Sequence, residues 1–126
     1  MPTVFVLDDS AINARSLSAR LRAIGYHVLS MSDEWEAVTI LREVRADLLV
    51  IDARCAAAGG AGLIREVRRD PAYRGMPVLV VGSDGLADAA RLADSVQPGE
   101  ILHTAPYEIV LDRVRSYLDP LSVPYH

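Results

Sequence analysis

The chain of 126 residues contains no lysine, so all 13 of its basic residues are arginine. Its only cysteine is Cys55, which excludes an internal disulfide. Acidic residues outnumber basic ones by 17 to 13, and the net charge of −4 argues against binding nucleic acid or a membrane surface through bulk charge. No apolar run is long enough to span a membrane, and the N-terminus lacks the charged start of a signal peptide. We therefore expect a cytoplasmic location and no membrane or nucleic-acid partner.

Five apolar segments alternate with five helical patterns along the chain, which predicts parallel βα units. We expect one domain over residues 1–119 and a short tail over 120–126, where Pro120 and Pro124 prevent a helix. The predicted fold is α/β, a three-layer αβα doubly wound domain with a five-stranded parallel sheet of order 2-1-3-4-5, as in flavodoxin-like folds. The predicted strands are 3–8, 27–31, 47–52, 78–81 and 100–103; the predicted helices are 11–24, 34–45, 62–69, 86–96 and 107–118, with a flexible glycine-rich loop before 62.

Three acids follow two of the predicted strands. Asp8 and Asp9 come after the apolar run 4–7, and Asp52 comes after the apolar run 48–51. The predicted strand order places these ends side by side at the switch point, where ligands bind in such sheets. Each pair of carboxylates at ~5 Å costs about 3 kcal/mol at an effective dielectric of ~20. A divalent cation relieves this repulsion, and the oxygen ligands suit Mg²⁺, with Mn²⁺ as the alternative ion.

The loop after the first strand reads Asp8-Asp9-Ser10-Ala11-Ile12-Asn13 and has no glycine. This argues against a nucleotide or flavin site, which would need a glycine-rich or hydroxyl-rich loop. A bound cation would also bridge a phosphoryl group to a carboxylate, and aspartate can form an acyl phosphate. The alternative is that Asp8 or Asp9 only caps the following helix and Asp52 only ends a strand.

With these features the sequence resembles a response-regulator receiver domain over about residues 3–118. The resemblance is carried by the apolar strand and acidic pair at 4–9, by Asp52, by Gly60 and by Pro106. The connector from Asp70-Pro71 to Met76-Pro77 also fits the family. The segment 113–115 is similar to receivers of diguanylate-cyclase regulators.

The resemblance implies that Asp52 accepts a phosphoryl group from a histidine kinase or phosphotransfer protein. It further implies that Asp9 binds Mg²⁺ directly, that Asp8 acts mainly through water, and that the backbone carbonyl of Arg54 completes the metal site. Such a domain is not an enzyme beyond self-catalysed phosphotransfer and dephosphorylation, and it signals to a downstream protein. A homodimer would form through the face made by residues 86–96, 100–103 and 107–118.

The sequence departs from the family where the phosphoryl group is normally sensed. Ala105 replaces the lysine before the proline, Gly82 replaces the hydroxyl residue after the fourth strand, and Leu102 replaces the aromatic of the fifth strand. Ser83 could supply the hydroxyl if the strand end shifts by one residue. Arg54 could contact a phosphoryl oxygen or neutralise the empty pocket, and Asp84 could pair with it. We therefore expect atypical switching.

Two other functions remain open at this point. The chain could be a degenerate receiver that acts as a phosphorylation-independent dimerisation or protein-interaction module. A Mg²⁺-dependent phosphohydrolase is disfavoured, because Asp8 and Asp9 are adjacent rather than one residue apart. Tyr107 and Tyr117, on the last predicted helix, would pack or form a partner surface. The sequence leaves open whether the domain acts alone or within a longer protein.

Overall fold

The computed structural model describes residues 1–8, 10–82, 92–102 and 106–119. Its five strands form one parallel sheet of order β2-β1-β3-β4-β5, which confirms the predicted topology. The strands are β1 (Thr3–Leu7), β2 (His27–Met31), β3 (Leu48–Asp52), β4 (Val78–Val81) and β5 (Gly99–Leu102). The helices are α1 (Ala11–Ala23), α2 (Glu34–Glu43), α3 (Ala53–Cys55), α4 (Ala61–Arg69) and α6 (Tyr107–Leu118), with a kinked helical turn η1 (Ala56–Gly60) and a 3-10 turn η2 (Pro71–Tyr73).

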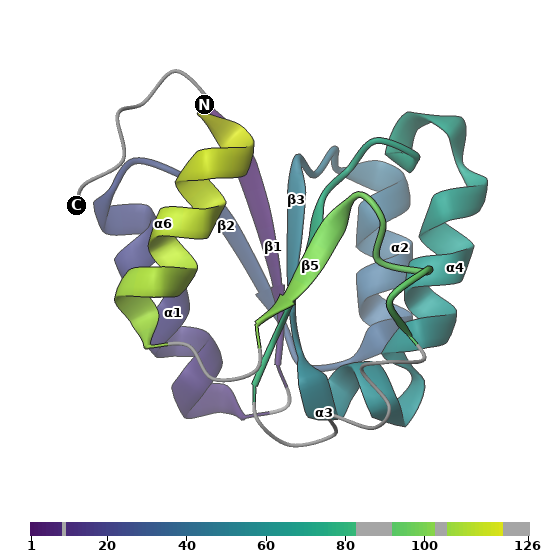
Figure 1. Ribbon diagram of the computed structural model, residues 1–126, viewed down its shortest axis with the longest axis horizontal. Coiled ribbons are helices and arrows are strands. Elements are labelled where there is room, and N and C mark those ends of the chain that lie inside the picture. Colours follow the sequence, from purple (N-terminus) through teal and green to yellow (C-terminus); the bar gives the residue numbers. More distant parts are fainter. Residues whose placement is uncertain (9, 83–91, 103–105, 120–126) are drawn as a thin grey trace.

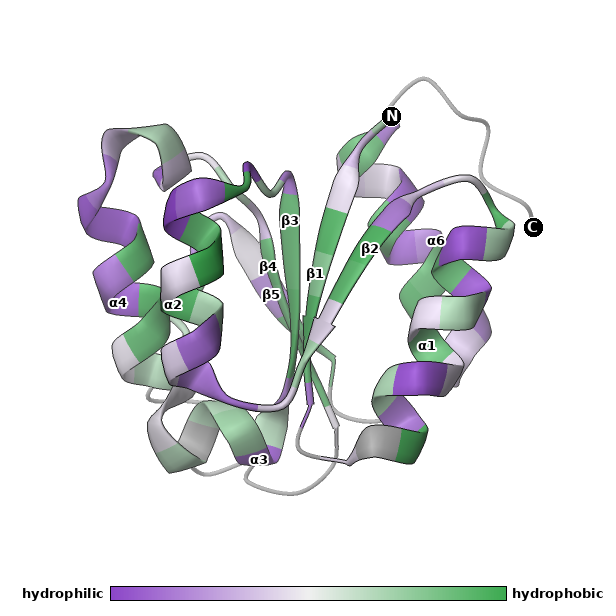
Figure 2. Ribbon diagram, turned by 180° about the vertical axis from the view of Figure 1, so that it is seen from behind, coloured by the Kyte–Doolittle hydropathy of each residue, from purple (hydrophilic) through white to green (hydrophobic). Residues whose placement is uncertain are grey.

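The helices cover both faces of the sheet. In Figure 1, α1 and α6 lie on one side and α2 and α4 lie on the other. Figure 2 shows mainly hydrophobic central strands, whereas the helices carry hydrophilic residues on their outer sides. Strands that are covered on both faces need apolar residues on both sides, and residues 4–7 of β1 and 48–51 of β3 are apolar throughout.

Each face of the sheet has its own hydrophobic core. Val4 and Val6 of β1 pack with α1 and α6, whereas Phe5 and Leu7 pack with α2 and α4. All four side chains are at most 2% exposed. The alternation follows from the two-residue repeat of a strand, which sends successive side chains to opposite faces. Among the described residues, no helix is long and apolar enough to cross a membrane.

The segment after β3 differs from the prediction. The glycines at 59, 60 and 62 predicted a loop before a helix at 62–69, but a first helical stretch already begins at Ala53 and only Gly59 interrupts it before α4. Asp52 caps this helix by accepting a hydrogen bond from the Arg54 amide, and the three alanines at 56–58 favour helix. Gly59, at φ +140° and ψ −15°, is not helical, so it separates this first helical stretch from α4 by a kink.

Other boundaries differ by one or two residues. β1 ends at Leu7 rather than Asp8, β3 begins at Leu48, and β5 begins at Gly99, one residue earlier than predicted. The helix predicted over 34–45 ends at Glu43, and the one predicted over 11–24 ends at Ala23, where Gly25 at φ +104° follows. Of the helix predicted over 86–96, residues 86–91 lie outside the described part of the chain.

Candidate functional site

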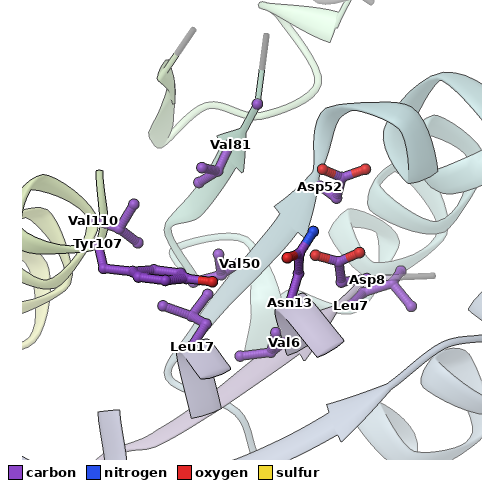
Figure 3. Close-up of a pocket in the computed structure, with 11 residues that line it drawn as sticks. Val6, Leu7, Asp8, Asn13, Leu17, Val50, Asp52, Val81, Tyr107 and Val110 are labelled. Atoms are coloured by element: carbon purple, nitrogen blue, oxygen red, sulfur yellow. The ribbon is translucent and has the colours of Figure 1, made fainter. Parts of the chain in front are cut away.

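The carboxyl ends of β1 and β3 border an open pocket of about 240 Å³. The two strands are direct neighbours, with Leu7 paired to Ile51, so Asp8 and Asp52 come to the same edge of the sheet. Figure 3 shows both acids in this pocket, together with Asn13 and Tyr107. Apolar side chains from β1, β3, β4, α1 and α6 form much of the remaining wall. Two of the three predicted acids therefore share one cavity.

Asp8 is held at the edge of the pocket by the turn that leads into α1. Its Oδ1 accepts a hydrogen bond of 2.9 Å from the Ser10 amide, and its own amide donates to the Met31 carbonyl at 3.1 Å. The cap of α1 is Ser10, whose hydroxyl accepts a bond of 3.4 Å from the Asn13 amide. Asp8 is therefore not the helix cap that the alternative interpretation required.

Asp52 combines a capping role with its place in the pocket. Its Oδ2 accepts a hydrogen bond of 3.1 Å from the Arg54 amide and lies 3.4 Å from Nε of the same arginine. The side chain of Asp52 is 17% exposed and that of Arg54 is 50% exposed. A pair this open to solvent contributes about 0–1 kcal/mol, so Arg54 shields Asp52 without fixing it strongly. The arginine lies at the acid, as expected for a residue that neutralises the pocket.

Several predicted site residues lie outside the described part of the chain. They are Asp9, Ser83, Asp84 and Ala105. Over the ranges that are described, no three acidic, histidine or cysteine side chains gather closely enough to hold a metal ion. Asp8 and Asp52 form a pair of carboxylates in an open pocket, and this donor chemistry fits Mg²⁺, which keeps several of its waters.

Gly82, at the end of β4, faces Asp52 directly. Its φ of +138° lies in a region that residues with a side chain rarely adopt. A β-carbon at this position would lie 3.3 Å from Oδ1 of Asp52 and 3.4 Å from the β-carbon of Ala53. The chain therefore takes a path here that suits glycine and leaves little room for the hydroxyl residue of the resembling family.

We expect Gly82→Thr to lower the free energy of unfolding by about 1–3 kcal/mol, because a threonine must adopt the strained φ or move the strand end. Urea unfolding measures this loss. Gly62→Ala is the matched control, since no atom lies within 4 Å of its added methyl group and its φ is ordinary. If Gly82→Thr were as stable as the parent protein, the end of β4 would be free to follow another path.

Leu102, at the position of the family's switching aromatic, is half-buried at the end of β5. It packs against the core that α1 and α6 share with the sheet. Its side chain has no hydrogen-bonding group, so it can respond to the pocket only through packing.

Two polar residues of the pocket were not predicted as site residues. Asn13 lies in the first turn of α1, and Tyr107 is the first residue of α6. The sequence interpretation gave Tyr107 a packing or partner role, but it lines the pocket, and the Arg20 guanidinium lies 4.6 Å from its ring centre. The available signal was position, since both residues lie in the first turn of a helix that follows a strand of the sheet.

Known proteins share both the sequence pattern and the fold. The family described as response regulator receiver domain matches residues 4–99 of the chain. A response regulator receiver protein of Anaeromyxobacter is 34% identical over 92 residues, which cover 72% of this chain and 39% of that protein. The probable transcriptional regulatory protein TcrX of Mycobacterium tuberculosis is 29% identical over 119 residues, which cover 92% of this chain and 49% of that protein. The chain thus spans about half or less of these relatives.

Solved structures give the same result for the fold. A response regulator from Thermotoga maritima superposes with a TM-score of 0.77 at 25% identity, covering 94% of this chain and 98% of that chain. The chemotaxis protein CheY4 of Vibrio cholerae superposes with a TM-score of 0.81 at 23% identity, covering 94% and 99%. The match over residues 4–99, on a sheet of order 2-1-3-4-5, means that this chain belongs to the response regulator receiver domain family of two-component systems.

Proposed function

We propose that Asp52 accepts a phosphoryl group from a histidine kinase or a phosphotransfer protein. The observation that carries this proposal is the position of Asp52, which ends β3 in the same open pocket as Asp8. This edge of a doubly wound sheet is where ligands bind. Oδ2 of Asp52 is engaged by Arg54, whereas Oδ1 accepts no hydrogen bond from the described residues. We assign the attack to Oδ1.

The proposed transfer leaves all atoms accounted for. Oδ1 forms a bond to phosphorus while the phosphorus–nitrogen bond of a phosphohistidine breaks, and the electron pair returns to the imidazole nitrogen, which takes up a proton. The product is an aspartyl phosphate. Arg54 would exchange part of its contact with Asp52 for a phosphoryl oxygen, a charge-assisted hydrogen bond.

Asp8, Asp9 and the backbone carbonyl of Arg54 would hold Mg²⁺ together with Asp52. Mg²⁺ supplies neutralisation of the carboxylates and of the incoming phosphoryl oxygens. One solved receiver domain with this fold, from the sensor histidine kinase PA1611 of Pseudomonas aeruginosa, is described as having a magnesium ion in its active-site cleft. Mn²⁺ has similar oxygen preferences and is the second ion that we propose for the site.

The rest of the functional proposal concerns signalling. The domain would span residues 1–119, act in the cytoplasm and carry out no reaction beyond its own phosphorylation and dephosphorylation. Its output would be contact with a downstream protein, with a homodimer through the face that includes β5 and α6. Switching would be atypical, because Gly82 and Ala105 offer no side-chain donor.

Acetyl phosphate with Mg²⁺ tests the phosphoacceptor. We expect the parent protein to gain ~80 Da, the mass of a phosphoryl group, and Asp52→Asn to gain none. Asparagine can still cap the helix after β3, so the variant is expected to fold. Asp94→Ala, which removes an exposed acid away from the pocket, serves as the matched control and should still gain the mass. Intact-protein mass spectrometry reads all three.

The second candidate function is a phosphorylation-independent interaction module. It is favoured by the backbone of Gly82, whose positive φ leaves little room for a hydroxyl residue. If the parent protein gains no mass from acetyl phosphate or from a kinase, this function replaces the first.

A further inference from the structure

We infer that Asn13 and Tyr107 donate the hydrogen bonds that hold a phosphoryl group on Asp52. This inference rests on the proposed function of Asp52. It assigns to two helix-borne side chains the part that a hydroxyl residue and a lysine play at the positions of Gly82 and Ala105 in the family.

The two side chains reach the pocket from different helices. Asn13 lies in the first turn of α1, and Tyr107 begins α6. Both line the pocket with Asp8 and Asp52. Figure 3 shows the Asn13 amide beside the carboxylate of Asp8, and it shows the Tyr107 ring extending from α6 with its hydroxyl directed into the pocket. A group attached to Asp52 would therefore enter a space that both side chains border.

Both residues have donors to offer. Within the described part of the chain, neither the Asn13 side chain nor the Tyr107 hydroxyl makes a hydrogen bond. An amide supplies two donors and a phenol supplies one. The other described polar groups of the pocket wall are the carboxylates of Asp8 and Asp52, which repel a phosphoryl group unless a cation lies between them.

The charge of the phosphoryl group strengthens the hydrogen bonds that these donors would make. It adds about −1.5 to −2 charge and strong acceptor oxygens. Arg54 is 50% exposed and already contacts Asp52, so it cannot satisfy all of these oxygens. Hydrogen bonds to a charged acceptor are about twice as strong as neutral ones, so two neutral donors suffice to orient the group.

Tyr107 also links the pocket to the surface between α1 and α6. The Arg20 guanidinium lies 4.6 Å from the centre of its ring, in a cation–π contact. A hydrogen bond from the hydroxyl to a phosphoryl oxygen would fix the ring, and with it the contact to Arg20. Occupancy of the pocket would then be sensed where α1 meets α6.

Beryllofluoride, a stable mimic of the phosphoryl group, tests the donors without phosphotransfer. We expect Tyr107→Phe and Asn13→Ala each to weaken its affinity about tenfold in the presence of Mg²⁺. The affinity for Mg²⁺ alone should stay within about twofold, because neither residue is a proposed metal ligand; damaged packing would lower both affinities. Titration calorimetry measures the two affinities, and thermal melting verifies that each variant is folded. Asn13→Leu provides a second uncharged variant without a donor.

Tyr117→Phe and Ser116→Ala are the matched controls. They remove hydroxyl groups from α6 whose hydrogen bonds, to Glu100 and to the Asp112 carbonyl, lie outside the pocket. Their affinity for beryllofluoride should equal that of the parent protein. If Tyr107→Phe and both Asn13 variants bind as tightly as the parent, the inference is wrong while the function of Asp52 stands. A parent protein that neither binds beryllofluoride nor gains ~80 Da overturns both.

Discussion

Replacing Arg68 by methionine lowers the free energy of unfolding by about 3 kcal/mol, the largest loss that we expect from one polar side chain. Arg68 lies in the last turn of α4, and its guanidinium donates to main-chain carbonyls of two separate segments, 73–76 and 96–98. Without the arginine these oxygens lose a charged donor in a partly buried place. The acceptors are Tyr73 at 2.8 Å, Arg74 at 3.4 Å, Val96 at 3.2 Å, Pro98 at 3.1 Å and also Met76.

Burying this cation has an energetic cost. Burial lowers the pKa of the Arg68 guanidinium, because the charged form is less well solvated there. Lysine should restore only part of the lost stability, since its single ammonium group cannot span several carbonyls as a planar guanidinium does.

Arg69→Met is the matched control for Arg68. Arg69 is the next residue, its side chain is 79% exposed, and it pairs with Glu66 at 3.3 Å. Such a pair contributes about 0–1 kcal/mol, so the control should unfold close to the parent protein in urea. Equal losses for the two variants would show that the carbonyl contacts of Arg68 contribute no more than an exposed ion pair.

Gly99→Ala should be similarly severe, with a loss of about 3 kcal/mol or more from strain and overlap together. Gly99 begins β5 at φ +152°, opposite Val78 of β4. A methyl group there would overlap the main-chain oxygen of Val78 and come within 2.5 Å of the Val96 oxygen. Relief would require β5 to move away from β4, which would break the hydrogen bond of 3.1 Å from the Val78 amide to the Pro98 carbonyl.

Gly75→Ala is the control for this prediction. No atom lies within 4 Å of its added methyl group, and its φ is not positive. Its stability in urea should stay within about 1 kcal/mol of the parent. If Gly99→Ala also unfolded at the parent's urea concentration, the pairing of β4 and β5 would not depend on this close approach.

Much of the fold could be predicted from sequence, because the strongest signals are local. The buried runs 4–7 and 48–51 are apolar at every position, as strands covered on both faces must be, and the helix at 107–118 has the predicted bounds. The segment 53–60 was mispredicted because its glycines were given more weight than the cap at Asp52. A glycine can join two helices at a kink as well as form a loop, and the backbone angles of Gly59 show a kink.

From the sequence, only those site residues that follow the ends of strands could be predicted. Asp8 and Asp52 meet because the order of the sheet puts β1 beside β3. Asn13 and Tyr107 join them through the packing of α1 and α6, and no spacing in the sequence reveals that contact. The positive φ of Gly82 was hidden for a related reason, since it depends on the path of the whole strand end.

The alternation of side chains along the strands also places the pocket on one side of the sheet, next to only one of the two layers of helices. Val4 and Val6 face α1 and α6, and Asp8 continues the same even-numbered series. Leu48, Val50 and Asp52 form the second such series. Both acids line the pocket together with residues of α1 and α6. In β1 and β3, enlarging or trimming Val6 or Val50 should change the pocket, whereas Phe5 and Ile51 pack against the other layer of helices.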